Sequence, residues 1–276
     1  MRKLRKCTAS QLNTGASKCP PEFGKMKGAI LVEPGTKLPA DLTADKLEEL
    51  AHANRPERIY GIGTFVEFAP NGGEVQTAAN GYGPEQITGL SARRDNFTLD
   101  NFYPELHAAL TKTHNKDWDA YFYDEDNRLY GLNDGSELLA GFPMSNVYSD
   151  ATPFPTSSEK STMSVNFSYR DAKEAAIGFD YIELDFNPQR LVLGLTPVTL
   201  EKVEGNEYKI VETIGSYDVT SIFGPLFVEA SDTIEGATAV TYNEAKETLT
   251  ITAEGEVSLK APKVLYEKGI KGIVAA

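Results

Sequence analysis

Residues 117–171 constrain the fold more than any other stretch, because both of its ends alternate apolar or aromatic residues with polar ones. A period of two is typical of β-strands that are buried on one side. The acidic run at residues 124–127 predicts a hairpin turn, since Asp and Asn side chains bond to nearby backbone and tolerate left-handed geometry. A polar, proline-containing segment at residues 148–161 separates the two ends, and loops of this length are usually functional or disordered. We therefore expect a β-scaffold that carries a large loop.

Short apolar or alternating runs bounded by glycine and proline recur along the chain, which predicts a mainly β fold. Residues 58–69 and 74–79 favour the two strands of a hairpin, and residues 176–186 favour another strand. Residues 104–113 predict a short helix with one apolar stripe, and residues 44–53 predict a second helix. We expect a β-sandwich or barrel that contains one or two short helices.

The pattern of the sequence changes near residues 187–190, and residues 191–195 favour a strand. No helical pattern follows until the last few residues, and short strands instead recur at roughly ten-residue spacing, typical of a small sandwich. We therefore expect an irregular arm at residues 1–28, a main β-domain with a short helix at residues 29–194, and a smaller C-terminal all-β, immunoglobulin-like domain at residues 195–276. Alternatively, the two halves share one sheet.

The charge of the chain is distributed unevenly. Residues 1–28 contain seven Lys and Arg residues and a single acid, Glu22, so this arm carries +6. Since the whole chain carries −13, the remainder carries −19 and should repel nucleic acid. A basic arm on an acidic body suggests self-association, in which the arm of one copy docks on the body of another. The alternative interpretation is a solvated, mobile tail.

Neither membrane insertion nor secretion is expected. No apolar run approaches the ~20 residues that cross a bilayer, and the basic start of the chain is followed by a polar segment at residues 7–13 instead of the apolar core of a signal peptide. Cys7 and Cys19 have no zinc or redox spacing. They could pair, but free thiols are the expected state in a cytoplasmic product.

No motif predicts catalysis, a cofactor or a metal, and we expect that the protein is not an enzyme. The chain has no nucleophile elbow and no phosphate-binding loop. There are three histidines, His52, His107 and His114. Only His107 and His114 are spaced so that one could lie two turns above the other on the predicted helix, and two histidines alone make a poor zinc site. A carboxylate pair could serve a hydrolase, but 40 acidic residues bring some pairs together by chance.

The acidic run resembles the start of a calcium-binding loop. Arg128 stands where an oxygen ligand is needed and Leu129 where a glycine is needed, so a charged hairpin tip is the better interpretation. Four aromatic residues of the same hairpin could stack on sugars or bases, although cross-strand packing in the core is favoured. They are Tyr121, Phe122, Tyr123 and Tyr130.

The order of these elements is similar to that of a known family. A basic arm, β-hairpins, the helix of residues 104–113 and further strands around a long loop resemble the tail tube proteins of long-tailed bacteriophages and related structural virion proteins. The amino-acid sequences of residues 78–85 and 153–171 resemble those of phage structural proteins from gut-type bacteria. In that family a β-sandwich or barrel packs with a helix, six copies close a ring, and rings stack into a tube that conducts DNA. The resemblance covers the layout of residues 29–190.

The resemblance implies a structural protein of the phage tail or neck, made in the bacterial cytoplasm without a signal peptide. Its partners would be further copies in a hexameric ring, other virion proteins, and DNA that passes without sequence-specific binding. The arm and the long loop would make the contacts between subunits. The contact residues expected from these segments are Arg2, Lys3, Arg5, Lys6, Tyr148, Phe154 and Lys160.

Two other functions remain open at this point. A bacterial surface or carbohydrate-binding β-module would explain the aromatic strand residues and the C-terminal sandwich. A hydrolase with a carboxylate pair is the third hypothesis.

Overall fold

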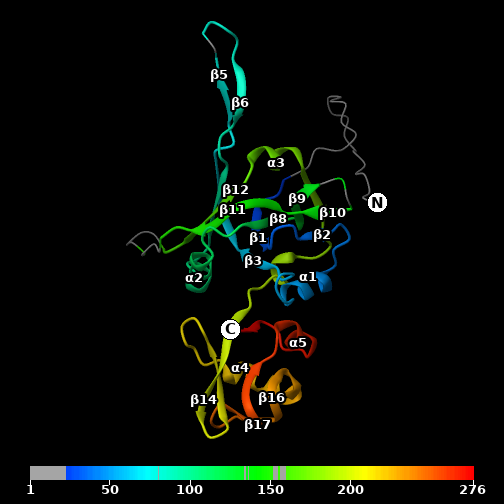
Figure 1. The fold of residues 1–276 in the computed structure, drawn as a ribbon, viewed down its shortest axis with the longest axis vertical. Coiled ribbons are helices and arrows are strands. Elements are labelled where there is room, and N and C mark those ends of the chain that lie inside the picture. Colours follow the sequence, from blue (N-terminus) through cyan, green and yellow to red (C-terminus); the bar gives the residue numbers. More distant parts are fainter. Residues whose placement is uncertain (1–22, 80, 134, 136, 152–154, 156–159) are drawn as a thin grey trace. The chain divides into compact units, whose positions relative to one another are not determined.

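Strand β8 (Trp118–Asp124) lies at the centre of the larger sheet, and its seven residues are all buried (Figure 1). One edge of β8 pairs with β1 (Met26–Val32). The other edge pairs with β11 (Phe142–Ser149) near the start of β8 and with β9 (Arg128–Asn133) near its end. Because β9 and β11 diverge from one edge of β8, the strands wrap around a common core.

The chain forms two units. The first unit contains residues Met1–Thr43 and Ile62–Gln189, and the second contains Ala44–Gly61 and Arg190–Ala276. With 46% strand and 18% helix, the protein is mainly β with few short helices, consistent with a sandwich, as predicted. The computed structural model describes residues 23–79, 81–133, 135, 137–151, 155 and 160–276.

The larger sheet contains eleven strands. Its path runs β2-β10-β9-β8-β11-β12-β7-β4, while β1 and β13 branch from β8 and β9, and β3 pairs with β1. The helices of the first unit are α2 (Pro104–Lys112) and α3 (Ala172–Ile177). The remaining strands of this sheet are β2 (Lys37–Pro39), β3 (Tyr60–Gly63), β4 (Phe65–Asn71), β7 (Arg94–Leu99), β10 (Leu138–Ala140), β12 (Met163–Tyr169) and β13 (Phe179–Glu183).

A cluster of phenylalanines fills the core of the first unit. Phe97 lies at its centre, with its ring 4.4 Å from Phe65, 5.3 Å from Phe122 and 5.5 Å from Phe167. These four side chains come from β7, β4, β8 and β12, so the cluster joins strands that are distant in sequence. Offset and edge-to-face ring pairs add to the stabilisation from apolar burial.

The second unit has a five-stranded sheet in the order β16-β17-β15-β14-β18. Three helices belong to this unit, α1 (Ala44–Ala51), α4 (Thr220–Glu229) and α5 (Pro262–Glu267). Short 3₁₀ turns occur at Pro188–Arg190 and Ser231–Thr233. The strands are β14 (Thr196–Glu204), β15 (Glu207–Glu212), β16 (Ile234–Asn243), β17 (Thr248–Leu259) and β18 (Ile273–Ala275).

Helix α1 belongs to the second unit, although the sequence assigned it to the main domain. The ring of His52, just after the helix, stacks on Tyr266 at 4.6 Å, and Glu48 pairs with Lys271 at 2.7 Å. These contacts join residues more than 200 positions apart, which a boundary drawn along the chain does not include. The units divide at Gln189 and Arg190, close to the predicted change of texture.

Local structure differs from prediction in three further places. Residues 172–177 form α3 before the strand predicted over residues 176–186 begins, and residues 191–195 form no strand. Helix α4 was not predicted. Because the second unit contains α4 and α5, it differs from the all-β, immunoglobulin-like domain that was expected. Among the described residues, no helix is long and apolar enough to cross a membrane.

Candidate assembly surface

Strand β4 forms an open edge of the larger sheet. It pairs with β7, and no other strand in the described part of the chain pairs with it. Only Phe65 is buried in this strand, while Val66 and Phe68 are 57% and 48% exposed. Pro70 lies nearer its end. An exposed edge of this kind is a template for pairing with another chain.

Strands β5 (Val75–Ala78) and β6 (Gln86–Leu90) form a ribbon that continues from β4 and β7 and extends away from the sheet (Figure 1). At its base, the Ser91 N–H donates to the Glu74 carbonyl at 2.9 Å. Gly72 has a φ of 77°, and a Cβ at this position would collide with the Ala92 carbonyl. The junction therefore requires glycine.

The ribbon has one apolar face and one polar face. Val75 pairs with Leu90 and Thr77 with Ile87, and the register shifts by one residue between these pairs. Because the shift compensates for the odd spacing of Leu90 and Ile87, both pairs lie on one face of the ribbon. The intervening pairs, Gln76 with Gly89 and Ala78 with Gln86, lie on the opposite face. We call the set Val75, Thr77, Ile87 and Leu90 the apolar ribbon face.

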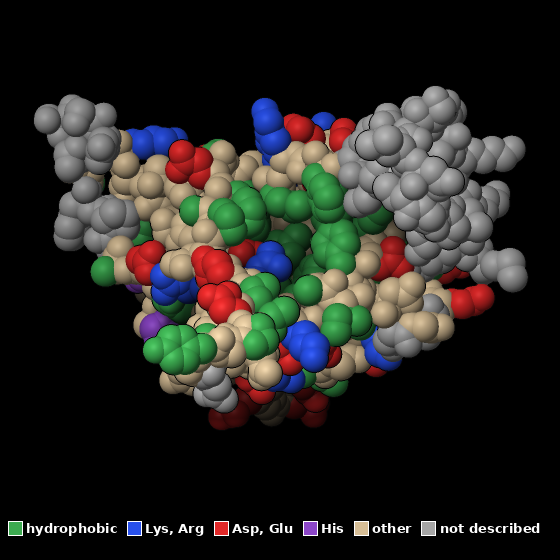
Figure 2. Space-filling model, turned by 90° about the horizontal axis from the view of Figure 1, so that it is seen from above, with side chains coloured by type: hydrophobic (Ala, Val, Ile, Leu, Met, Phe, Trp, Pro, Cys, Tyr) green, Lys and Arg blue, Asp and Glu red, His purple; other side chains and the backbone are tan. Residues whose placement is uncertain are grey.

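Within the described part of the chain, this apolar ribbon face is left largely uncovered. Val75 and Ile87 are 57% and 74% exposed, and Tyr82 near the tip is fully exposed. A two-stranded hairpin is only marginally stable alone in water. Hydrophobic side chains also gather over the middle of the face seen in Figure 2, with charged side chains around them. Exposed apolar surface of this kind is typical of a contact with another molecule.

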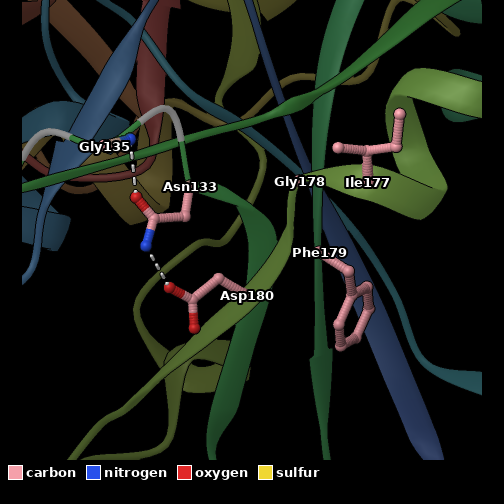
Figure 3. A pocket seen from close by; sticks show the side chains of 6 residues that line it. All are labelled: Asn133, Gly135, Ile177, Gly178, Phe179 and Asp180. Atoms are coloured by element: carbon pink, nitrogen blue, oxygen red, sulfur yellow. Dashed lines mark hydrogen bonds between the residues drawn. The ribbon is translucent and has the colours of Figure 1, made fainter.

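A shallow groove of about 350 Å³ lies between the end of β9 and the start of β13 (Figure 3). Asn133 donates to Asp180 at 2.8 Å and accepts from the Gly135 N–H at 2.8 Å, so these polar groups bond to one another. Ile177 and Phe179 contribute exposed apolar side chains. The described residues that line the groove are Asn133, Gly135, Ile177, Gly178, Phe179 and Asp180.

Most of the predicted subunit contacts lie outside the described residues. Two of them can be placed. The Tyr148 hydroxyl accepts a hydrogen bond from Arg94 Nη1 at 3.0 Å, so this side chain is already held within its own subunit. Lys160 is exposed. Both remain predicted contacts, as do those that cannot be placed, which are Arg2, Lys3, Arg5, Lys6 and Phe154.

The acidic hairpin contains a saturated buried carboxylate instead of a calcium site. Asp124 is 2% exposed and accepts from the N–H groups of Gly24, Asp126 and Arg128, from Arg128 Nη1 at 3.2 Å and from the Tyr130 hydroxyl at 2.6 Å. Burial alone would raise the pKa of Asp124, but the hydrogen bonds from Tyr130 and the backbone outweigh burial and lower it. Arg128 also pairs with Asp126 at 2.8 Å. The guanidinium therefore supplies the positive charge of the hairpin.

His52, His107 and the hairpin aromatics have structural partners. His107 Nδ1 lies 2.7 Å from the Ser149 hydroxyl, and no group of His, Cys, Asp and Glu in the described residues could hold a metal. Tyr121, Phe122 and Tyr130 are at most 5% exposed, as is their neighbour Tyr123. The interpretation of these aromatic residues as core is confirmed.

Replacing Asp119 with Asn is expected to stabilise the protein at neutral pH by up to about 1 kcal/mol. Asp119 is 7% exposed, and burial raises the pKa of its carboxyl although the Gly35 N–H donates to it at 2.7 Å. In the unfolded chain the carboxyl loses its proton at lower pH, near its ordinary pKa of 3.8. The buried carboxyl therefore destabilises the folded state increasingly as the pH rises above 3.8. Urea unfolding at pH 3 and pH 7 should show the gain at pH 7 alone. The exposed Asp117 provides the control, because Asp117→Asn should give no such gain.

Sequence reasoning missed the apolar ribbon face. It predicted residues 74–79 as the return strand of a hairpin with residues 58–69 and assigned no strand at residues 86–90. The predicted hairpin is wrong, because β5 pairs with β6 and β4 pairs with β7. Val75 and Thr77 are two residues apart, but Ile87 and Leu90 are three apart, so only the register shift in the ribbon brings them to one face. No alternation in the sequence indicated this face. The long loop at residues 148–161 was predicted as the contact surface instead, because of its length.

No protein-family model, curated protein or solved structure matches this chain.

Proposed function

We propose that the chain is a structural subunit that assembles with its own copies into rings or a tube, as part of a phage tail or neck. The observation that carries this proposal is the apolar ribbon face, which extends from the sheet beside the open edge of β4. Both features need a partner that the chain does not provide within the described residues. A neighbouring copy supplies one to every subunit.

A heterologous contact suits this surface. The sheet has a second open edge at β13, which pairs with β9 alone among the described strands. The groove with Ile177 and Phe179 lies beside that edge. When one surface of each copy meets a different surface of the next, the assembly closes into a ring or continues as a filament. Closure also protects the strand edges from uncontrolled aggregation.

The charge of the chain is compatible with a conduit for DNA. Outside residues 1–28 the chain carries −19. A wall of like charge does not hold a polyanion, so DNA would pass without binding. The carbohydrate-binding alternative has less support, because Tyr121, Phe122, Tyr123 and Tyr130 are buried and offer no face to a sugar.

Acidic substitutions on the two faces of the ribbon test this proposal. Wild-type protein should form rings or tubes by electron microscopy. The double variant Val75→Asp with Ile87→Asp should remain monomeric in analytical ultracentrifugation, because it places two charges in the apolar contact. The matched control, Gln76→Asp with Gln86→Asp, adds the same charge on the polar face and should still assemble.

Two outcomes would contradict the proposal. Wild-type protein that stays monomeric at high concentration would refute self-assembly. Assembly of the Val75→Asp and Ile87→Asp variant at the wild-type concentration would show that the ribbon is not the contact. Circular dichroism of each variant checks that the fold is retained.

A further inference from the structure

Two arginines in the segment that joins α1 to β3 have no carboxylate partner in the described part of the chain. Arg58 is 8% exposed, and its Nε donates to the Ala53 carbonyl at 2.8 Å. No ion pair is formed by Arg58 or Arg55 with any described residue, including Glu57 between them. Burying a guanidinium without an anion is costly, because the charge loses its hydration.

The other buried arginine of the described residues shows the usual solution. Arg128 pairs with Asp124 and Asp126, and Arg93, which is half-buried, pairs with Asp95 at 2.8 Å. Burial lowers the pKa of both guanidinium groups, but their carboxylate partners outweigh it and raise the pKa. For Arg58 burial again lowers the pKa. Tyr60 offsets this effect only in part, and the charge of Arg55 adds to the lowering. Arg58 is thus the buried guanidinium that lacks a counter-charge.

Arg55, three residues before Arg58, is held in place by a tyrosine. Its Nε donates to the Tyr60 hydroxyl at 2.9 Å, and its guanidinium carbon lies 5.9 Å from the centre of the Tyr60 ring. These contacts hold one edge of the guanidinium and leave its terminal nitrogens without a described partner. The Arg58 N–H donates to the Asn54 carbonyl at 3.1 Å, so both arginines belong to one turn of the chain. Two guanidinium groups on one turn, each with terminal nitrogens that make no hydrogen bond to a described residue, are suited to an oxyanion that accepts from both.

We propose that Arg55 and Arg58 form a binding site for an oxyanion, either a carboxylate or a phosphate group. Guanidinium forks match the paired oxygens of these groups, and the anion would supply the counter-charge that Arg58 lacks. The oxyanion has two possible sources. One is a carboxylate side chain of another copy, since the chain has 40 acidic residues. The other is a free anion such as inorganic phosphate.

Inorganic phosphate is the probe for the site. Sodium phosphate should raise the thermal unfolding midpoint of the full chain more than sodium chloride of equal ionic strength, because it binds the folded state. In Arg55→Gln and in Arg58→Gln, the dissociation constant for phosphate measured by calorimetry should rise about tenfold or more. Arg58→Lys keeps the charge and should bind with intermediate affinity. The control is Arg170→Gln, which removes an exposed arginine paired with Asp117 at 3.1 Å and should bind as the wild type does.

A second measurement distinguishes the two sources. If a carboxylate of another copy occupies the site, phosphate should weaken self-association in ultracentrifugation, and Arg55→Gln should weaken it in the absence of phosphate. If the ligand is a free anion, neither should change self-association. Equal midpoints in phosphate and chloride would overturn the proposal, as would an unchanged phosphate affinity in Arg55→Gln, whose exposed side chain is not needed for folding. The phosphate result does not depend on assembly, so it can fail or succeed independently of the proposed function.

Discussion

Replacing Asp124 with Asn is expected to lower the free energy of unfolding by about 3–5 kcal/mol at neutral pH. The carboxylate accepts from three backbone N–H groups, from Arg128 and from Tyr130. An amide has one acceptor oxygen instead of two, and it leaves the buried Arg128 without its closest buried counter-charge. Chemical denaturation at pH 7 measures the loss. Asp126→Asn is the control, because Asp126 is half exposed and its pair with Arg128 contributes at most about 1 kcal/mol.

The pH dependence of the Asp124 effect has a defined sign. The folded state lowers the pKa of this carboxyl below its ordinary value of 3.8. Its contribution is therefore fully present above pH 3.8 and is lost as pH falls through the lower, folded-state value. The difference in unfolding free energy between wild type and Asp124→Asn should shrink below pH 3.8. A difference that stays constant with pH would show that the carboxylate charge is not the cause.

Replacing Phe97 with Ala is expected to cost about 3–5 kcal/mol of stability. Phe97 is 2% exposed, and its ring touches three other buried rings, those of Phe65, Phe122 and Phe167. Because these rings come from separate strands, they cannot all move to fill the cavity. Thermal or urea unfolding measures the effect. Phe68→Ala removes a ring that is 48% exposed, so a similar loss in that variant would argue against a central role of Phe97.

The elements that local patterns specify were predicted from the sequence. The hairpin of β8 and β9 follows from alternation and from an Asp-rich turn, and α2 follows from Pro104 and one apolar stripe. Helix α4 could not be predicted in this way, because Gly224 and Pro225 in its interior oppose a helix. Packing of Phe227 in the core of the second unit stabilises it instead. This is a tertiary contribution that no local pattern contains.

The candidate surfaces were less predictable than the fold. The loop at residues 148–161 was predicted as the assembly contact because it is long. The apolar ribbon face depends instead on strand register, which shifts between Gln76 and Thr77. The arginine site depends on the burial of Arg58, and arginine is usually exposed. Neither register nor burial can be read from residue types alone. The apolar ribbon face follows from strand pairing, and the arginine site follows from the exposure of each side chain in the fold.

Pro70 gives the open edge of β4 a built-in stop. A proline has no N–H, so a strand that adds to this edge cannot receive a hydrogen bond from that position. Added pairing is therefore confined to the five residues of β4 before it, at positions 65–69. A contact of this length would fix the register between two chains, and strand pairing would not continue past Pro70 into β5. The same strand can then join one neighbour firmly while remaining a poor seed for fibril growth.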